Sequence, residues 1–233
     1  MEAALANPRR EQLARLVVAP GKTLGPGVRA RTDAPMPEPL DASEVSRLLP
    51  AGAVHQGYAL LAAPLEPAEL EEMASPAEGV ILVLDQVTDP QNVGAILRSA
   101  AAFGARGLVL QERRAPQLSG ALAKAAAGAA DLVPVARVVN LSRALERLSD
   151  LGWRSIGLAA SAEHPLQEVL DGPATVLVLG SEGEGLRRLV AEHCDVMARI
   201  AMAQGFESLN VASAATVALY EASRLARRGR GAP

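Results

Sequence analysis

Short apolar runs alternate with amphipathic stretches along most of the chain after residue 79. The apolar runs predict strands at residues 80–84, 107–110, 132–135, 154–158, 175–179 and 196–200. The stretches between and after them predict helices at residues 90–102, 118–128, 141–149, 164–170, 185–192 and 209–226. Strands that alternate with helices are typical of an α/β fold, with a parallel sheet flanked by helices. The first and fifth runs are almost entirely apolar, which favours strands buried on both faces.

The first 63 residues have a different pattern, and we interpret residues 1–63 as a small, separate α/β domain. They predict helices at residues 3–16 and 43–49 and strands at residues 16–19 and 58–62. The segment 20–39 contains five proline and three glycine residues, so it is predicted to be a loop. Asp41 and Glu44 have the spacing of a capping box, in which two side chains bind backbone N–H groups where a helix begins.

The segment that follows this domain is acidic. Residues 64–78 include three proline residues and several glutamates. This composition predicts a linker between the small domain and the larger domain at residues 79–233.

Composition and charge limit the classes of function. The net charge is −3, which is not the basic balance usual for nucleic-acid-binding domains, although 21 of the 23 basic residues are arginine. Arginine has a planar guanidinium that suits phosphate recognition. The single cysteine, Cys194, excludes an internal disulfide and fits a reducing compartment. Because the chain has neither an apolar run of about 18 residues nor a signal-peptide pattern, we expect a cytoplasmic protein without a membrane span.

Two loops that follow predicted strands carry candidate site chemistry. Residues 180–185 include three glycines after the strand at 175–179, and residues 207–210 (ESLN) follow the strand at 196–200. The carboxyl ends of parallel strands are where α/β proteins bind ligands, so we expect both loops to belong to one site. Glycine would let a ligand approach the backbone closely there.

Three segments of the chain resemble the motifs of an enzyme family, and they have the same order and spacing as those motifs. They are residues 89–100 (DPQNVGAILRSA), 179–186 (LGSEGEGL) and 200–210 (IAMAQGFESLN). Over residues 78–228 the chain resembles the SpoU-type (SPOUT superfamily) RNA ribose 2′-O-methyltransferases. Residues 2–10 and 52–57 are similar to the subfamily that has an N-terminal RNA-recognition domain and methylates guanosine in 23S ribosomal RNA. That domain normally begins several residues earlier, so either the start of the chain is assigned too late or the domain lacks its first element.

The resemblance implies a reaction, a fold detail and an assembly. The reaction is methyl transfer from S-adenosylmethionine to a ribose 2′-hydroxyl of 23S ribosomal RNA, with no metal. The fold detail is a trefoil knot at the C-terminal end of the parallel sheet. The assembly is a homodimer whose catalytic residues come from both subunits.

Site residues follow from the same resemblance, position by position. The catalytic group is assigned to Arg98, Asn92, Glu182, Ser208 and Asn210, and the cofactor contacts are assigned to Gly180, Ile200 and Leu209. Met202 is added to the cofactor contacts because it lies close enough to line the same slot. A guanidinium stays protonated and is a poor base. We therefore expect Arg98 to hold the target phosphate and to stabilise the forming alkoxide.

Several of these assignments have a structural alternative. Arg98 taken alone is a solvated surface residue, Ile200 and Leu209 suit a plain core, and Ser208 suits a helix N-cap. His55 fits either a turn or an RNA contact. Adjacent His and Cys residues at 193–194 lack the further ligands that a metal site needs.

Alternative functions also remain open. A transfer RNA methyltransferase would use the same chemistry, and an RNA-binding relative without activity would keep the fold. A nicotinamide-dependent oxidoreductase is disfavoured, because no G-x-G-x-x-G turn follows the first strand.

Overall fold

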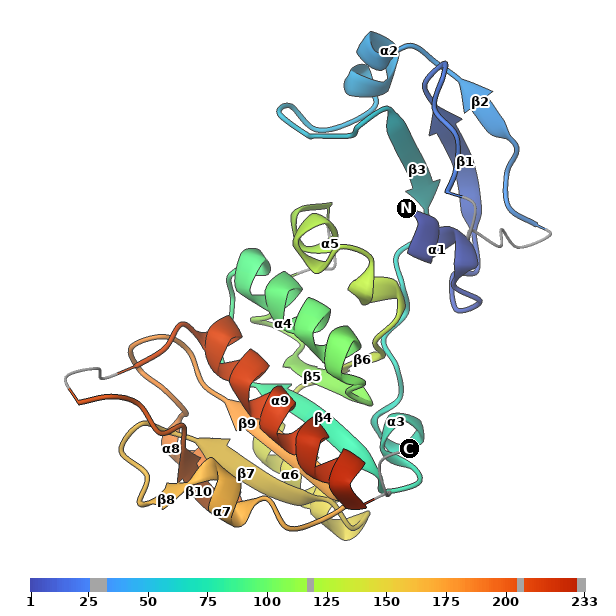
Figure 1. Cartoon of the computed structure of the whole chain (residues 1–233). Helices are drawn as coiled ribbons and strands as arrows, with labels where there is room; N and C mark the ends of the chain where they lie inside the picture. The colour runs from blue at the N-terminus through green and yellow to red at the C-terminus, as the bar shows by residue number, and fades with distance from the viewer. Residues whose placement is uncertain (26–32, 117–119, 205–207, 230–233) are drawn as a thin grey trace. The chain divides into compact units, whose positions relative to one another are not determined.

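The chain forms two compact units, Met1–Glu66 and Pro67–Pro233 (Figure 1). The computed structural model describes residues 1–25, 33–116, 120–204 and 208–229, with side chains described as far as residue 225.

The first unit is built on a three-stranded sheet in the order β2-β1-β3. Its elements are α1 (Glu2–Ala6), β1 (Leu13–Val18), β2 (Pro37–Pro39), α2 (Ala42–Arg47) and β3 (Tyr58–Ala62). The central strand β1 is parallel to β2 and antiparallel to β3. Leu5, Leu16 and Val18 form the small buried core of this unit.

The predicted capping box at the start of α2 is confirmed. The side-chain Oδ1 of Asp41 accepts hydrogen bonds from the backbone N–H groups of Ser43 at 2.8 Å and Glu44 at 2.9 Å. In return, Oε2 of Glu44 accepts from the Asp41 N–H at 2.9 Å. The hydrogen bond from the Glu44 N–H is the largest of the effects that lower the pKa of Asp41.

The prediction of a helix at residues 3–16 is wrong. Helix α1 ends at Ala6, and the chain from Leu13 onward forms β1 instead. Asn7 precedes a proline, and steric conflict with the proline ring drives the preceding residue out of the helical region. Asn7 accordingly has the extended angles φ −81° and ψ 113°.

The second unit contains the predicted parallel sheet, which is therefore confirmed. Seven strands lie in the order β6-β5-β4-β9-β7-β10-β8, and all of the strand pairs are parallel. The strands are β4 (Gly79–Leu84), β5 (Gly107–Gln111), β6 (Val135–Val138), β7 (Arg154–Leu158), β8 (His164–Pro165), β9 (Ala174–Leu179) and β10 (Val196–Arg199).

Helices cover both faces of this sheet. They are α3 (Leu70–Ala74), α4 (Pro90–Phe103), α5 (Gly120–Ala126), α6 (Leu141–Asp150), α7 (Leu166–Val169), α8 (Arg188–Glu192) and α9 (Val211–Gly229), with a short 3-10 turn at Ala129–Asp131. In β4, Val80, Leu82 and Leu84 join the core with α4, α5 and α9, whereas Ile81 and Val83 join the core with α3, α6 and α8. Burial on both faces explains why the strand is apolar at every position. None of the described helices is long and apolar enough to cross a membrane.

Several predicted boundaries need correction. The strand predicted at 132–135 begins only at Val135, because Pro134 has no N–H to donate to a neighbouring strand. The helix predicted at 185–192 begins at Arg188, since Gly185 adopts a left-handed φ of +68°. The helix predicted at 164–170 is a two-residue strand, β8, followed by α7. The start predicted for the helix at 118–128 falls outside the described residues.

In the structure, residues 64–78 are not only a linker between the two units, as was predicted. Most of it belongs to the second unit, because Leu70, Met73 and Ala74 of α3 are buried in the core beneath the sheet. A Cβ atom on Gly107 would lie 2.0 Å from the sulfur of Met73, so a larger residue in β5 would displace the Met73 side chain of α3. The backbone oxygen of Ala74 also accepts a hydrogen bond from the Trp153 ring nitrogen at 2.8 Å.

The order of the strands identifies one point of the sheet as a place for a ligand. From β4 the chain moves outward through β5 and β6, and it then returns to the other side of β4 as β7 and β9 (Figure 1). Open α/β sheets bind ligands outside the carboxyl ends of the strands where the order reverses in this way. Here that point lies between β4 and β9.

Candidate active site

Asn92, Glu182 and Asn210 lie together although they are far apart in the sequence. Oε1 of Glu182 accepts hydrogen bonds from Nδ2 of Asn92 at 3.2 Å and from Nδ2 of Asn210 at 2.5 Å. Nδ2 of Asn210 also donates to Oδ1 of Asn92 at 3.0 Å. These three side chains, which we call the Asn–Glu–Asn cluster, join α4, the loop after β9 and the residue before α9.

The orientation of Asn210 is fixed by its position at the start of α9. Its Oδ1 accepts hydrogen bonds from the backbone N–H groups of Ala212 at 3.0 Å and Ser213 at 3.3 Å. Since Oδ1 caps the helix, Nδ2 is directed toward Glu182. The alternative that Ser208 caps this helix is wrong, because Asn210 occupies the capping position; Ser208 is exposed.

The charge of Glu182 suits its place in the cluster. The backbone N–H of Val211, the first residue of the 19-residue helix α9, lies 3.4 Å from Oε1 of Glu182. A negative charge at the N-terminal end of a helix is stabilised by the helix dipole. Oε2 of Glu182 accepts no hydrogen bond from the part of the chain that the structure describes.

The loop after β9 is closed tightly at its base. A Cβ atom on Gly180 would lie only 2.1 Å from the carbonyl carbon of Gly185, so no larger residue fits there. The Gly185 N–H donates to the Ser181 carbonyl oxygen at 3.0 Å. This loop, residues 180–187, presents Glu182 to the cluster.

The other predicted cofactor residues follow β10 or precede α9. Ile200 is half-buried and packs against the core that contains α4 and α9, and Met202 is also half-buried. Leu209 is 39% exposed and directly precedes Asn210 of the cluster. Glu207 of the same segment lies outside the described residues.

The structure does not bring Arg98 to the cluster within one chain. Its side chain is exposed on α4 and forms no hydrogen bond or ion pair with any residue in the described ranges. On a helix, six residues separate Asn92 and Arg98 by about 9 Å along the axis and by about 120° around it. The neighbouring Ser99 faces α9, where its hydroxyl lies 2.6 Å from that of Thr216.

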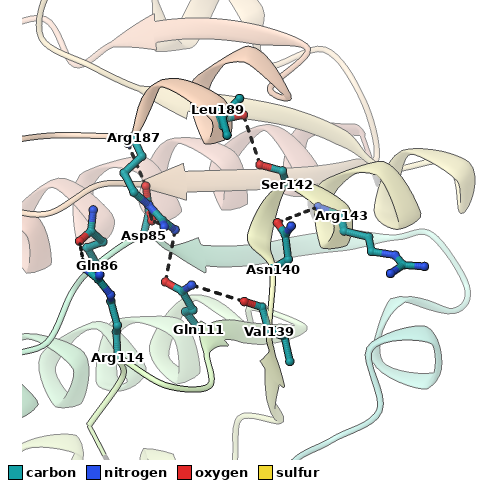
Figure 2. A network of polar contacts seen from close by, with 10 residues as sticks. All are labelled: Asp85, Gln86, Gln111, Arg114, Val139, Asn140, Ser142, Arg143, Arg187 and Leu189. Atoms are coloured by element: carbon teal, nitrogen blue, oxygen red, sulfur yellow. Dashed lines mark hydrogen bonds and ion pairs between the residues drawn. The ribbon is translucent and has the colours of Figure 1, made fainter.

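Three polar residues at the ends of β4 and β5 and of the loop 180–187 were missed by the sequence analysis. Asp85 is fully buried at the end of β4 and binds Arg187, whose Nη2 also donates to Oε1 of Gln111 at 3.2 Å (Figure 2). The available signal was a carboxylate placed directly after the apolar run at 80–84. Its partner, 102 positions away, could not be identified from the sequence.

The described residues include no group of three or more His, Cys, Asp or Glu side chains that could hold a metal ion. His193 has its Nδ1 at 2.7 Å from the Leu189 carbonyl oxygen and its Nε2 at 3.1 Å from Glu146. Cys194 donates to the Val190 carbonyl oxygen at 3.3 Å. Both side chains thus have structural partners.

We predict that Cys194 reacts slowly with thiol reagents in the native protein. Burial, followed by the nearby charges of Asp195 and Asp85, raises the pKa of the Cys194 thiol to about 12. Because only the thiolate reacts, alkylation by iodoacetamide at pH 8 should be at least ~100-fold slower than in the urea-unfolded protein. The native rate should keep rising as the pH approaches 12. Equal native and unfolded rates at pH 8 would contradict the prediction.

In the first unit, the hydrogen bonds of His55 favour the turn alternative. The Gly57 N–H donates to Nδ1 of His55 at 3.1 Å, so Nδ1 carries a lone pair. The Ser46 hydroxyl donates to the Ala42 carbonyl oxygen at 2.9 Å, so it accepts from Nε2 of His55 at 3.0 Å. Both ring nitrogens therefore have structural partners, Nδ1 in the turn at Gly57 and Nε2 at Ser46 of α2.

The chain is similar in sequence to curated RNA methyltransferases. The chain is 44% identical over 177 residues to the 23S rRNA (guanosine-2′-O-)-methyltransferase RlmB of Pseudomonas syringae, over 73% of this chain and 70% of that protein. In other curated relatives the matched segment spans from 46% to 72% of their length.

Solved structures share the fold. An RNA 2′-O ribose methyltransferase superposes with a TM-score of 0.72 and 25% identity, over 93% of this chain and 82% of that one. The SpoU methyltransferase AviRb of Streptomyces viridochromogenes, in complex with the cofactor AdoMet, superposes with a TM-score of 0.75 and 24% identity, over 94% and 85% of the two chains. Residues 79–220, which include the whole Asn–Glu–Asn cluster, match the SpoU rRNA Methylase family, and the chain belongs to that family.

Proposed function

We propose that this protein transfers a methyl group from S-adenosylmethionine to the ribose 2′-hydroxyl of a guanosine in 23S ribosomal RNA. The observation that carries this proposal is the Asn–Glu–Asn cluster, which unites residues of three family segments at the reversal point of the sheet. The choice of 23S ribosomal RNA is supported by the relative from Pseudomonas syringae.

The residues around the loop 180–187 fit the cofactor. An adenine ring requires an apolar surface and backbone partners, and it does not require charged side chains. Gly185 has no atom within 4 Å of the place where a Cβ would stand, while Met202 and Leu209 present apolar atoms that are only partly covered. When bound, the sulfonium of S-adenosylmethionine would supply a methyl group that is already activated. Gly180, Ile200, Met202 and Leu209 are the residues proposed to hold it.

The remaining residues would act on the RNA. Asn92, Asn210 and Ser208 would orient the ribose hydroxyl, and the carboxylate of Glu182 would fix both asparagines. Arg98 would bind the target phosphate and stabilise the alkoxide as the hydroxyl passes its proton to that phosphate, since the guanidinium cannot accept the proton. The new O–CH3 bond would form as the S–CH3 bond breaks, which leaves S-adenosylhomocysteine.

We propose a homodimer in which Arg98 completes the site of the partner subunit. In a single chain, Arg98 forms no contact with the cluster. Helix α9 also exposes two large apolar side chains on one side, Val217 at 38% and Tyr220 at 52%. A second copy of this chain would cover them and would supply the missing arginine.

The finer features of the fold belong to the same proposal. The first unit would recognise the RNA, and its surface hollow lined by Lys22, Asp41 and Tyr58 offers polar groups for that contact. The C-terminal part of the second unit would form a trefoil knot, as in the family that the motifs resemble. The protein would act in the cytoplasm.

The test is transfer of tritium from labelled S-adenosylmethionine to unmodified 23S ribosomal RNA and to bulk transfer RNA, with the labelled ribose mapped. We expect label on a guanosine of the 23S RNA. The Glu182→Gln variant should lose about 10–100-fold in rate, because charge-assisted hydrogen bonds of about 1.5–3 kcal/mol are replaced at Oε1. Glu184→Gln is the matched control, since Glu184 is exposed in the same loop.

Each outcome has a distinct meaning. Label only on transfer RNA would keep the chemistry and replace the substrate. Cofactor binding without label on either RNA would indicate an RNA-binding relative without activity. Equal losses of methyl-transfer rate in the Glu182 and Glu184 variants would mean that the Asn–Glu–Asn cluster has no special role.

A further inference from the structure

Asp85 has a fully buried carboxylate that requires stabilising partners. Its side chain has no exposed surface, and it follows β4 directly at the reversal point of the sheet. Its backbone N–H donates to the carbonyl oxygen of Leu179 at 2.8 Å, so it lies beside the last residue of β9. A buried carboxylate is unfavourable unless it is paired and hydrogen-bonded.

Arg187 supplies that pairing with three separate groups. The backbone N–H of Arg187 donates to Oδ2 of Asp85 at 2.9 Å, and Nε donates to Oδ1 at 2.8 Å. Nη2 lies 2.6 Å from the same Oδ1 and also donates to Oε1 of Gln111 at the end of β5. Gln111 in turn donates from Nε2 to the Val139 carbonyl oxygen after β6, at 3.4 Å. Figure 2 shows how this chain of contacts connects Arg187 to the ends of three neighbouring strands.

Arg187 is also the last residue of the loop 180–187. The loop is held at its base by the contact between Gly180 and Gly185, and at its tip by the hydrogen bonds of Glu182. The bonds from Arg187 to Asp85 fix its third point, where the chain leaves the loop and enters α8. With three fixed points, the loop has a defined path before any ligand arrives.

We propose that Asp85 and Arg187 are a positioning pair that preorganises the loop 180–187 for the methyl donor. Neither residue touches the reacting atoms; they hold the backbone around Gly180 and the carboxylate of Glu182 in the geometry that the Asn–Glu–Asn cluster requires. A preorganised loop binds its ligand more tightly because no ordering remains to be done during binding. The inference rests on the proposed function, since it concerns the same cofactor loop.

The test compares Arg187→Gln and Arg187→Lys with Arg188→Gln in the full-length protein. Arg188 is the matched control, because it is the next residue and its side chain forms, among the described residues, only an exposed ion pair with Glu192 at 2.7 Å. Two quantities are measured at a temperature where every variant is folded: hydrogen exchange of loop amides without cofactor, and calorimetric affinity for S-adenosylmethionine. Steady-state kinetics then separate KM for the cofactor from kcat.

We expect Arg187→Gln to raise the exchange rate of the Gly185 amide at least tenfold and to weaken cofactor affinity at least tenfold. KM for the cofactor should rise by a similar factor, while kcat at saturating cofactor should change less than threefold, because bound cofactor reorders the loop. Arg187→Lys, which keeps the charge but loses Nε and the planar fork, should be intermediate. Asp85→Asn should resemble Arg187→Gln, and if it does not fold the Arg187 variants decide the question.

Two results would overturn the inference. One is a lower Tm for Arg187→Gln with unchanged exchange, affinity and KM, which would mean that the pair only stabilises the fold. The other is an equal effect of Arg188→Gln on all these measurements. Failure of the wild-type protein to bind S-adenosylmethionine would instead overturn the proposed function, and hydrogen exchange would still report whether the pair orders the loop.

Discussion

Replacing Arg98 with alanine should reduce methyl transfer by about 100–1000-fold while leaving the fold unchanged. Removal of one group that stabilises a developing oxyanion typically costs this much in rate. The fold should survive because Arg98 is exposed and bonds to none of the residues that the structure describes. Single-turnover transfer to 23S ribosomal RNA and thermal unfolding measure the two effects separately.

The control for Arg98→Ala is Arg143→Ala, another exposed arginine on a helix of the same unit. Mixing Arg98→Ala with Glu182→Gln tests whether the site is shared between subunits. If Arg98 acts on the partner, roughly a quarter of wild-type activity should return, because half of the dimers are mixed and each has one intact site. A mixture that stays inactive would mean that each site is formed by one chain alone. Full activity of the Arg98→Ala variant by itself would mean that Arg98 has no catalytic role.

Replacing Gly180 with alanine should abolish cofactor binding and destabilise the second unit. The new Cβ would lie 2.1 Å from the carbonyl carbon of Gly185 and 2.4 Å from the Leu186 nitrogen, so the backbone itself must move. Overpacking of this kind costs about 1–3 kcal/mol, which corresponds to a decrease in Tm of roughly 2–12 °C for a domain of this size. Calorimetric titration with S-adenosylmethionine and a thermal melt are the measurements.

Gly172→Ala is the matched control for Gly180→Ala. Gly172 precedes the same strand, and a Cβ there would meet nothing within 4 Å. This variant should keep the affinity and the Tm of the wild type. Normal cofactor affinity in Gly180→Ala would contradict the assignment of the loop 180–187 to the cofactor.

The sheet could be predicted from the sequence because its central strands are buried on both faces. Nearly all residues of β4 and β9 are apolar, because these strands lie between two helical layers, so the apolar pattern is almost continuous. The ends of strands and helices were harder to predict where they depend on a single residue. Pro134 delays β6 and Asn7-Pro8 ends α1, although the surrounding residues favour continuation.

Part of the candidate site could also be predicted from the sequence, and part could not. Asn92, Glu182 and Asn210 were identified through their segments, and the structure brings them together. The pair of Asp85 and Arg187 was not identified, because neither residue belongs to a periodic pattern and 102 positions separate them. Only the parallel pairing of β4 with β9 brings the two together, and strand order cannot be read from local sequence.

The distance along the chain between Asn92 and Asn210 also matters during protein synthesis. The two residues are 118 positions apart, and ribosomes add about 5–20 residues per second, so roughly 6–24 s separate their appearance. During most of that interval β9 has not yet been made. The backbone N–H and C=O groups of β4 that pair with β9 in the folded protein are therefore unpaired. Newly made chains are therefore most exposed to aggregation and to chaperones in this window, and a ribosome that stalls before α9 releases a product without a site.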